Sequence, residues 1–254
     1  MRFLKAFVVA FSMYSRIPMP KFTWDSEDMK YHLIFFPWVG AVIGALEYGL
    51  LILTEKYNIL NSAFAALAIA IPLIVTGGFH LDGFMDVEDA ISSFKTREER
   101  LEILKDPHVG AFSVINVIIV GLLLFASILI MDRNSFIIWG FSFFMARALS
   151  GMLVVRGKKA KSEGMLYSEA KNTSDKPVFV SLCIELILSF CLAFVISPFR
   201  ACFAFVIPIV TVLTLAKKAG RLFGGITGDV AGWYVVNAEF LSAIFLALYK
   251  YLEV

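Results

Sequence analysis

The chain has 254 residues, of which 59% are hydrophobic and 17% charged, and its mean hydropathy is +0.79. Soluble domains average about 45–50% apolar and about 25% charged residues, so this composition excludes the ordinary soluble class and indicates a polytopic membrane protein. The net charge is only +2. No global field or nucleic-acid-binding motif therefore points to nucleic acid as a partner.

The first part of the chain reads MRFLKAFVVAFSMYSRIPMP. Its basic and apolar residues resemble those of a signal peptide, but it lacks a small-residue cleavage site, and Arg16, Pro18 and Pro20 interrupt it. We expect a short amphipathic or interfacial helix that is retained in the mature chain.

Seven apolar stretches follow, and a membrane-spanning helix needs about 20 such residues. We expect spans at 32–53, 59–79, 109–131, 136–155, 178–196, 201–216 and 233–249. The sixth is short and contains Pro208, so we expect it to be kinked or tilted. The sequence thus predicts an all-α membrane bundle of about seven helices that forms a single domain over residues 1–254.

The distribution of basic residues supports this number of spans. Segments 1–31, 80–108, 156–177 and 217–232 alternate to one side and hold 18 Lys and Arg residues, whereas the loops on the other side hold 4. Cytoplasmic loops carry the excess of positive charge. We therefore expect a cytoplasmic N-terminus, cytoplasmic loops at about 80–108, 156–177 and 217–232, and chemistry at the cytoplasmic membrane face.

Cysteine usage indicates neither a disulfide scaffold nor a zinc site. The three cysteines lie in apolar runs without CxxC spacing, and we expect them to pack as small apolar side chains: Cys183, Cys191 and Cys202.

An acidic cluster follows the second expected span. Asp82, Asp86 and Asp89 are spaced i, i+4, i+7, which places them on one face of a helix. Glu88 points elsewhere and is expected to be solvated. Carboxylates on one stripe repel one another, and Mg²⁺ is the natural ion to offset that repulsion, because it takes oxygen ligands and is usually shared with substrate phosphate. The three aspartates are candidate metal ligands and catalytic residues.

The residues around the cluster favour a site over the simpler alternative, a solvated helix start whose acids face the positive end of the dipole. Gly77 and Gly78 indicate a break where the chain leaves the bilayer. Gly83 allows a phosphate or a neighbouring backbone to come close. His80 is a candidate general base or phosphate contact, with an orienting or packing role as the alternative.

A second cluster is rich in glycine and spans residues 221–233, RLFGGITGDVAGW. Glycine leaves backbone N–H groups free to approach phosphate, so Gly224, Gly225 and Gly228 are candidate phosphate contacts, together with the Thr227 hydroxyl. Asp229 is expected to complete the metal site. The segment is not a Walker A motif, and a flexible turn between spans is the alternative. The topology places it on the same membrane face as Asp82.

Basic residues supply a third element. Arg147 lies within an expected span, where a charge is costly and usually faces a polar cavity or a carboxylate such as Glu47 or Glu239. Arg147, Lys161 and Lys105 are candidate phosphate contacts. Positive-inside anchoring explains most of the basic loop that contains Lys161, and snorkelling is the alternative for Lys105. Together the three elements suit transfer of a phosphate-linked group.

The motifs resemble those of the cobalamin synthases, the adenosylcobinamide-GDP ribazoletransferases. GGFHLDGFMDVEDAISSF and the later RLEILKDPHVGAFSV resemble the family's GGxHxDGxxDxxDG and KDxxxGxFG stretches; GGITGDVAG, YSRIPMP and AKSEGM resemble its GGxTGDxxG, TRxPxP and ARxEG. The matches keep the family's order over nearly the whole chain. Departures are Ser15 for Thr, Glu88 for a small residue, Ala90 for Gly and Lys161 for Arg.

The resemblance implies the last assembly step of the coenzyme B12 nucleotide loop, in which α-ribazole or its 5′-phosphate attacks adenosylcobinamide-GDP and GMP leaves. It also implies a Mg²⁺ requirement and the prokaryotic inner membrane. For this reaction we expect Asp82 and Asp86, together with Asp89 and Asp229, to bind Mg²⁺. Asp89 is the expected base for the hydroxyl of α-ribazole. A homo-oligomer, or contact with other corrinoid-pathway enzymes, is left open.

Two other functions compete with this one. CDP-alcohol phosphotransferases also carry spaced aspartates on membrane helices, but their DGxxAR pattern lacks its Ala-Arg here, because Phe84, Met85 and Asp86 follow Gly83. A secondary transporter would use intramembrane acids such as Glu47, Glu185 and Glu239 for ion coupling. No repeat symmetry supports it, and the acidic cluster lies at the membrane surface.

Overall fold

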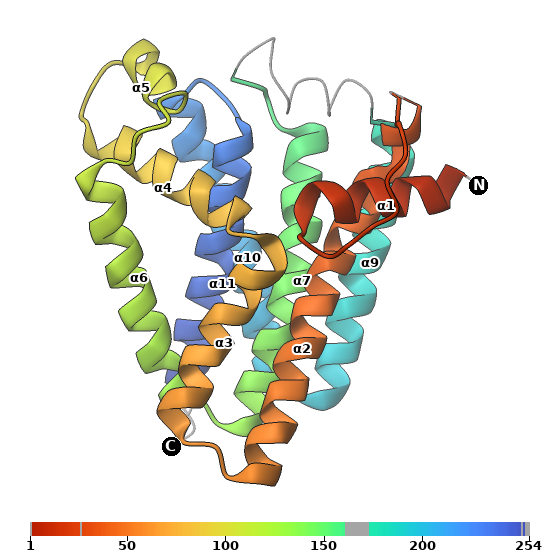
Figure 1. Cartoon of the computed structure of the whole chain (residues 1–254), viewed down its shortest axis with the longest axis vertical. Coiled ribbons are helices and arrows are strands. Elements are labelled where there is room, and N and C mark those ends of the chain that lie inside the picture. Colours follow the sequence, from red (N-terminus) through yellow and green to blue (C-terminus); the bar gives the residue numbers. More distant parts are fainter. Residues whose placement is uncertain (1, 26, 161–172, 250, 252–254) are drawn as a thin grey trace.

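The computed structural model describes residues 2–25, 27–160, 173–249 and 251. Its helices lie side by side in a bundle (Figure 1), as the all-α prediction requires. In chain order they are α1 (Arg2–Tyr14), η1 (Asp28–Phe35), α2 (Phe36–Tyr57), α3 (Asn61–Thr76), α4 (Phe79–Ser92), α5 (Arg97–Ile103), α6 (Ala111–Ile130), α7 (Arg133–Arg156), α9 (Asp175–Ile196), α10 (Pro198–Leu222) and α11 (Gly228–Tyr249).

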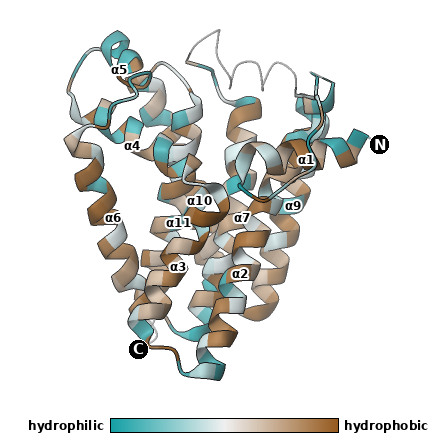
Figure 2. Cartoon of the chain, in the orientation of Figure 1, coloured by the Kyte–Doolittle hydropathy of each residue, from teal (hydrophilic) through white to brown (hydrophobic). Residues whose placement is uncertain are grey.

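The apolar helices account for the membrane spans. Among the described residues, 6 helices are long and apolar enough to cross a membrane, or 7 if the bent pair of α3 and α4 counts as one span. Figure 2 shows hydrophobic residues along the upright helices and hydrophilic residues gathered near their ends. The protein is therefore a multi-pass membrane protein, and these 6 or 7 spans agree with the expected helical bundle of about seven.

The second expected span differs from the prediction at its end. We expected it over 59–79, but α3 ends at Thr76 and the chain bends by 97° into α4. Gly77 and Gly78 make the bend with φ of +68° and +81°, which glycine adopts at little cost. As a result α4 does not continue across the membrane but lies along the end of the bundle (Figure 1).

Local signals set the other helix boundaries. Asn58 takes a left-handed conformation after α2, as C-terminal caps often do. Thr96 and Glu99 form a reciprocal capping box at the start of α5. The Asp132 side chain accepts a hydrogen bond from the Ser135 N–H and caps α7. The predicted N-terminal helix is present as α1.

The core is built around α7, which packs against α2, α9, α10 and α11. Its closest neighbour is α2, where Gly40 and Gly44 face it. A Cβ at Gly40 would lie 2.2 Å from the Phe143 carbonyl oxygen, and one at Gly44 would lie 2.5 Å from the Gly140 carbonyl oxygen. Small residues four apart allow such close packing of membrane helices. Of the cysteines, all three are free.

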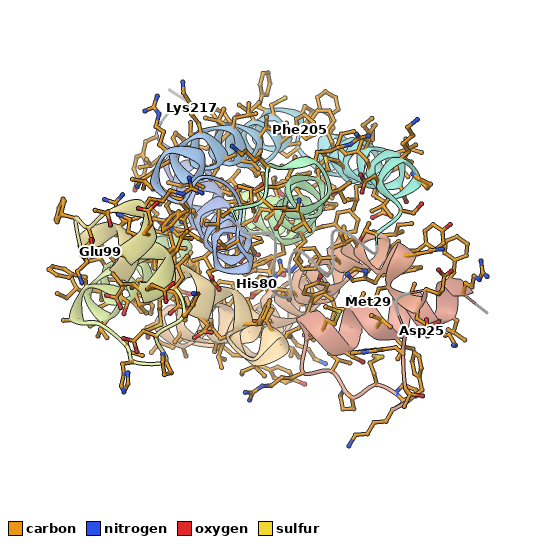
Figure 3. All side chains as sticks on the ribbon, turned by 90° about the horizontal axis from the view of Figure 1, so that it is seen from above. Asp25, Met29, His80, Glu99, Phe205 and Lys217 are labelled. Atoms are coloured by element: carbon orange, nitrogen blue, oxygen red, sulfur yellow. The ribbon has the colours of Figure 1, made fainter. Side chains whose placement is uncertain are left out.

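One end of the bundle carries α1, α4, α5 and the turn between α10 and α11 (Figure 1). We call this end the α4 face. Figure 3 looks onto it, with His80 near its centre. The described parts of the four segments that the sequence assigned to one side of the membrane lie at this end. Which side of the membrane the α4 face meets stays a prediction.

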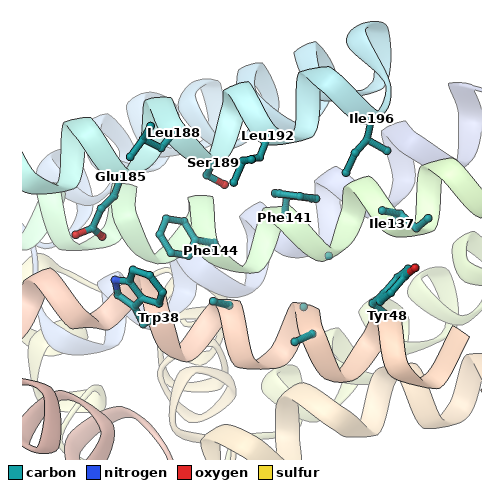
Figure 4. A pocket seen from close by; sticks show the side chains of 14 residues that line it. Trp38, Tyr48, Ile137, Phe141, Phe144, Glu185, Leu188, Ser189, Leu192 and Ile196 are labelled. Carbon is teal, nitrogen blue, oxygen red and sulfur yellow. The ribbon is translucent and has the colours of Figure 1, made fainter. Parts of the chain in front are cut away.

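A separate groove of about 700 Å³ lies between α2, α7 and α9 (Figure 4). Its lining is almost entirely apolar, with Trp38 and Tyr48 at its two ends and the Glu185 carboxyl as its acidic group. The described lining residues come only from these three helices. The groove therefore does not belong to the acidic cluster on α4.

Candidate active site

Two glycines allow α4 to cross α11 at very short range. A Cβ on Gly83 would lie 2.9 Å from the Cα of Asp229, and a Cβ on Gly232 would lie 3.1 Å from the carbonyl oxygen of His80. A side chain at Gly83 would force the backbones apart, and one at Gly232 would need the backbone of His80 to shift. The crossing thus brings Asp229, in the first turn of α11, against the helix that carries the predicted aspartates. Of the two roles proposed for Gly83, the structure shows the close approach of a neighbouring backbone.

The aspartates of the two helices form one electrostatic group. Asp82 is exposed on α4, and Asp86 is half-buried one turn later. Burial, followed by the negative charges of Asp82, Asp229 and Asp89, raises the pKa of Asp86 to about 6. Four carboxylates therefore repel one another at this point of the α4 face, as the spacing predicted for the three on α4. We call Asp82, Asp86 and Asp89 the aspartate stripe.

Asp89 has a structural role in addition to its place on the stripe. Its Oδ2 accepts a hydrogen bond from the Gly110 N–H at 2.7 Å, and its Oδ1 accepts one from the Ser113 N–H at 3.0 Å. These are backbone donors at the start of α6, which the helix itself cannot satisfy. Asp89 therefore ties α4 to α6.

The prediction that Glu88 is solvated is wrong. Its Oε1 accepts a hydrogen bond from the Trp233 indole at 2.7 Å, and its Oε2 accepts one from the Asn116 amide at 3.3 Å. Trp233 lies on α11 and Asn116 on α6. The side of helix α4 that carries Glu88 is covered by α6 and α11, so Glu88 joins all three helices.

His80 is buried in the first turn of α4. Its ring is 5.6 Å from that of Phe36 and 5.5 Å from that of Phe79, and among the described residues its Nδ1 has no hydrogen-bond partner. Burial, helped by the positive charge of Arg147, lowers the pKa of His80 well below its usual range. The imidazole is therefore neutral and positioned by packing, which matches the alternative role foreseen for it.

The glycine-rich turn is held by backbone contacts. Gly224 has φ +80°, and a Cβ there would overlap the guanidinium of Arg97, whose Nε donates to the Phe223 carbonyl at 3.1 Å. Gly225 lies against the backbone of Lys158 and its neighbours. This packing explains these two glycines without a ligand.

The end of the turn starts α11. The Thr227 Oγ1 accepts a hydrogen bond from the Val230 N–H at 3.2 Å and so caps the helix. It also donates to Asp229 Oδ2 at 3.3 Å. Gly228 is exposed, and a Cβ there would meet nothing within 4 Å. The turn thus fixes Asp229 beside the stripe and leaves Gly228 open to a substrate.

The two predicted phosphate-binding cations that the structure describes, Arg147 and Lys105, are paired with other carboxylates. Arg147 is buried inside the bundle, where its Nη1 donates to Glu239 at 2.5 Å and to the Phe143 carbonyl at 2.8 Å. The expected pairing of Arg147 with Glu239 is confirmed. Lys105 is exposed and pairs with Glu102 at 2.6 Å. Lys161 lies outside the described residues.

Arg16 is not among the predicted site residues, although the YSRIPMP motif contains it. The structure places it beside the bend before α4, where its side chain lies over Gly77. The sequence feature that could have pointed to Arg16 is the YSRIPMP motif itself. In the structure Arg16 follows α1 and lies outside any helix.

The donor chemistry of the acidic group suits a hard divalent cation. The described residues contain no group of three or more potential metal ligands in ready-made geometry. Mg²⁺, however, usually takes one or two carboxylates and completes its shell with waters and substrate phosphates. The crowding that raises the pKa of Asp86 is the imbalance that a cation relieves. One or two of the carboxylates of Asp82, Asp86 and Asp229, completed by waters and phosphate oxygens, would suit such an ion.

Fold and site together define a class: a polytopic helical membrane protein with a carboxylate-rich site at one end of its bundle. The particular family follows from comparison with known proteins. The family model for cobalamin-5-phosphate synthase matches residues 6–247. The chain therefore belongs to the cobalamin synthase family, and it is an enzyme of cobalamin biosynthesis.

Individual relatives agree over nearly their full lengths. The adenosylcobinamide-GDP ribazoletransferase of Lachnoclostridium phytofermentans is 36% identical over 244 residues, which is 96% of this chain and 94% of that protein. The enzyme of the same name from Clostridium perfringens is 33% identical over 248 residues, 97% of this chain and 98% of that protein. That of Desulfitobacterium hafniense is 32% identical over 252 residues, 95% and 96% of the two chains. No solved structure matches.

Proposed function

We propose that this protein transfers the adenosylcobinamide-phosphate part of adenosylcobinamide-GDP to α-ribazole or α-ribazole 5′-phosphate. The products are adenosylcobalamin or its 5′-phosphate, and GMP. The relatives bear the name of this reaction. The structural observation that carries the proposal is the meeting of Asp82, Asp86, Asp89 and Asp229 at the crossing of α4 and α11.

The reaction needs little covalent chemistry from the protein. A hydroxyl oxygen of the acceptor bonds to the phosphorus attached to adenosylcobinamide, and the bond from that phosphorus to the bridging oxygen breaks. GMP leaves with the electron pair. The hydroxyl proton passes to a carboxylate of the aspartate stripe. We do not assign the proton to Asp89, the base expected from the sequence, because both of its oxygens already hold the start of α6.

Mg²⁺ is the cofactor we propose, held by Asp82, Asp86 and Asp229. When bound, it supplies charge neutralisation at the diphosphate and at the departing phosphate. The protein's own part is to hold the carboxylates at one point. Gly83 and Gly232 do so by allowing the helix crossing, and Thr227 does so by capping α11.

We also propose that the α4 face meets the cytoplasm, at the inner membrane of a prokaryote. The charge asymmetry of the sequence supports this orientation. Nucleotide-linked substrates are polar, so a site at the end of the bundle can receive them from water without carrying them into the hydrocarbon layer.

The test is a defined reaction with purified protein. Protein in detergent is incubated with adenosylcobinamide-GDP and either acceptor, with Mg²⁺ or with EDTA, and products are followed by mass spectrometry. We expect GMP and the cobalamin product to form in equal amounts and only when Mg²⁺ is present. Formation of neither product with either acceptor would overturn the proposed function.

The same assay separates the alternatives. Release of CMP from a CDP-alcohol would favour the phosphotransferase alternative. A proton flux into proteoliposomes without any substrate would favour the transporter. Membership of the cobalamin synthase family speaks against both.

A further inference from the structure

A second groove lies at the bend between α3 and α4 and has a volume of about 730 Å³. It is formed by the segment after α1, the last turn of α3 and the first turn of α4. Its lining residues are Arg16, Ile17, Pro18, Leu73, Ile74, Val75, Gly77, Gly78 and Leu81. Arg16 is the ionised residue in this lining, and the rest of the wall is apolar or glycine.

Arg16 is fixed to the bend by its backbone and by its side chain. Its N–H donates to the Val75 carbonyl at 2.8 Å. Its side chain occupies the space above Gly77, so that a Cβ on Gly77 would come within 2.3 Å of the Arg16 Nε. Gly77 therefore has two roles. Its φ of +68° makes the bend, and its lack of a side chain leaves space for Arg16.

Arg16 is an exposed residue, and its side chain forms no ion pair with any described residue. In this it differs from the other arginines near the site. Arg147 is bonded to Glu239, and Arg97 donates to the Phe223 carbonyl. Arg16 is thus available to an anion from solution at the start of α4.

The groove continues the line of the aspartate stripe. Gly78 lines it, and Asp82 lies four residues later on the same face of α4. One turn of helix, about 5.4 Å, therefore separates the groove from the first carboxylate of the stripe. A substrate that reaches from the stripe towards the start of α4 passes directly into the groove.

We propose that Arg16 binds the phosphate of a phosphorylated acceptor in this groove and so sets the enzyme's preference for that acceptor over the unphosphorylated one. The inference rests on the proposed function and adds to it a specificity-determining residue. Arginine binds phosphate through two parallel N–H donors. A ribose carries its ring hydroxyls and its 5′-phosphate at opposite ends of one sugar, a span comparable with one turn of α4.

Size and polarity of the groove agree with this occupant. Ligand pockets for small molecules measure about 300–1,000 Å³, and this groove falls in that range. Ile17, Pro18 and Leu81 give an apolar wall for the flat base of a nucleotide, while a corrinoid ring with its side chains is too large for the groove. In this arrangement the donor diphosphate binds at the aspartate stripe.

The test compares two acceptors in three variants. Purified wild type, Arg16→Gln and Arg16→Lys are assayed for kcat/KM with α-ribazole 5′-phosphate and with α-ribazole. Lys21→Gln, which changes an exposed cation five residues along the chain that does not line the groove, is the matched control. We expect Arg16→Gln to lose about 10- to 100-fold with the phosphorylated acceptor, as for a lost charged hydrogen bond, and to change little with the other.

Arg16→Lys should recover part of the lost kcat/KM, because lysine keeps the positive charge but lacks the two parallel N–H donors of arginine. Lys21→Gln should behave as wild type. An equal loss with both acceptors in Arg16→Gln would overturn the proposal, since it would show a general structural role. Phosphate could also come from a lipid headgroup, because Ile74 beside the groove is exposed. An Arg16→Gln effect that vanishes in vesicles of phosphatidylcholine alone, and returns with phosphatidylglycerol, would likewise overturn it.

A binding measurement separates this inference from the proposed function. Equilibrium dialysis of each acceptor against wild type and Arg16→Gln requires no turnover. Tighter binding of the phosphorylated acceptor to wild type, lost in Arg16→Gln, would support Arg16 even if no GMP formed. Equal binding of both acceptors to wild type would overturn the role of Arg16, even if the transfer reaction proceeded.

Discussion

The four carboxylates at the helix crossing have unequal surroundings. Asp82 is exposed, Asp86 is half-buried among the other three, and Asp229 follows the cap of α11. Asp89 is occupied by two backbone donors of α6. Substitutions of these residues should therefore have different effects. A change at Asp82 should affect the reaction, and a change at Asp89 should affect the stability of the fold.

Asp82→Asn should lower kcat/KM for transfer by about 100-fold or more while the protein still inserts and unfolds normally. The carboxamide removes a negative ligand for the proposed cation but keeps the size of the side chain. GMP release by the purified variant measures the effect, and Glu102→Gln, an exposed acid on α5, is the control. Near-normal turnover in Asp82→Asn would reject the assignment of this residue to the metal site.

Asp89→Ala should lower the free energy of unfolding by about 0.5–2 kcal/mol, the usual cost of a lost helix cap. The physical reason is that the Gly110 and Ser113 N–H groups lose their acceptor. Thermal unfolding in detergent gives the measurement. Unchanged stability together with lost activity would show instead that Asp89 acts only in the reaction.

At the scale of elements, the site depends on how closely α4 crosses α11. Gly83 and Gly232 allow the two backbones to approach closely. Glu88 bonds α4 to α11 through Trp233 and to α6 through Asn116. The position of the stripe relative to Asp229 is therefore a property of three packed helices. Small changes in this packing should move the carboxylates apart.

Gly83→Ala should destabilise the protein by about 1–3 kcal/mol, as overpacking does, and should lower activity as well. The new Cβ would lie 2.9 Å from the Asp229 backbone, so the helices must separate. Gly49→Ala on α2 is the control, because a Cβ there meets nothing within 4 Å. Equal unfolding temperatures for the two variants would contradict the described crossing.

A buried ion pair joins α7 to α11 below the site. Arg147 is 1% exposed and bonds to Glu239 at 2.5 Å. Both groups would be costly to leave alone in the apolar interior. The pair therefore explains why a charged residue stands in the middle of a span, and it fixes the two helices that flank His80.

Arg147→Met should destabilise the protein by about 3–5 kcal/mol, because Glu239 is left without its partner. The double variant Arg147→Met/Glu239→Met should regain much of this stability, since no buried charge remains. Detergent-solubilised yield and unfolding temperature are the measurements. A double variant no more stable than the single one would argue that Arg147 acts through other contacts.

For the whole molecule, the arrangement separates a polar end from an apolar bundle. The described parts of all the segments with excess positive charge lie at the α4 face, together with the candidate active site and the groove of Arg16. The groove between α2, α7 and α9 lies along the spans instead. Polar substrates can thus reach the site from one side of the membrane only.

A labelling experiment tests the orientation. In a variant without the three native cysteines, Glu98→Cys probes the α4 face and Lys56→Cys probes the opposite end, both at exposed positions. An impermeant maleimide added to intact cells should label Lys56→Cys and spare Glu98→Cys. The reverse pattern would place the α4 face outside the cell.

Composition and residue spacing were enough to predict the class of the protein and most of its elements. A helix must be about 20 apolar residues long to cross the bilayer, so the candidate spans could be found from the sequence. The i, i+4, i+7 spacing of Asp82, Asp86 and Asp89 placed them on one helix face. Gly77 and Gly78 marked the break. The ordered motifs indicated the family that the comparisons confirm.

The contacts that side chains make with neighbouring helices could be learned from the folded structure alone. Spacing along one helix cannot show that α6 takes the oxygens of Asp89, that Trp233 and Asn116 hold Glu88, or that Arg147 turns inward to Glu239. Nor can it show Arg16 lying over Gly77, since that contact joins segments about sixty residues apart. Such pairings depend on how helices cross, and a crossing is set by the fit of two surfaces in space, which the order of residues along either helix does not specify.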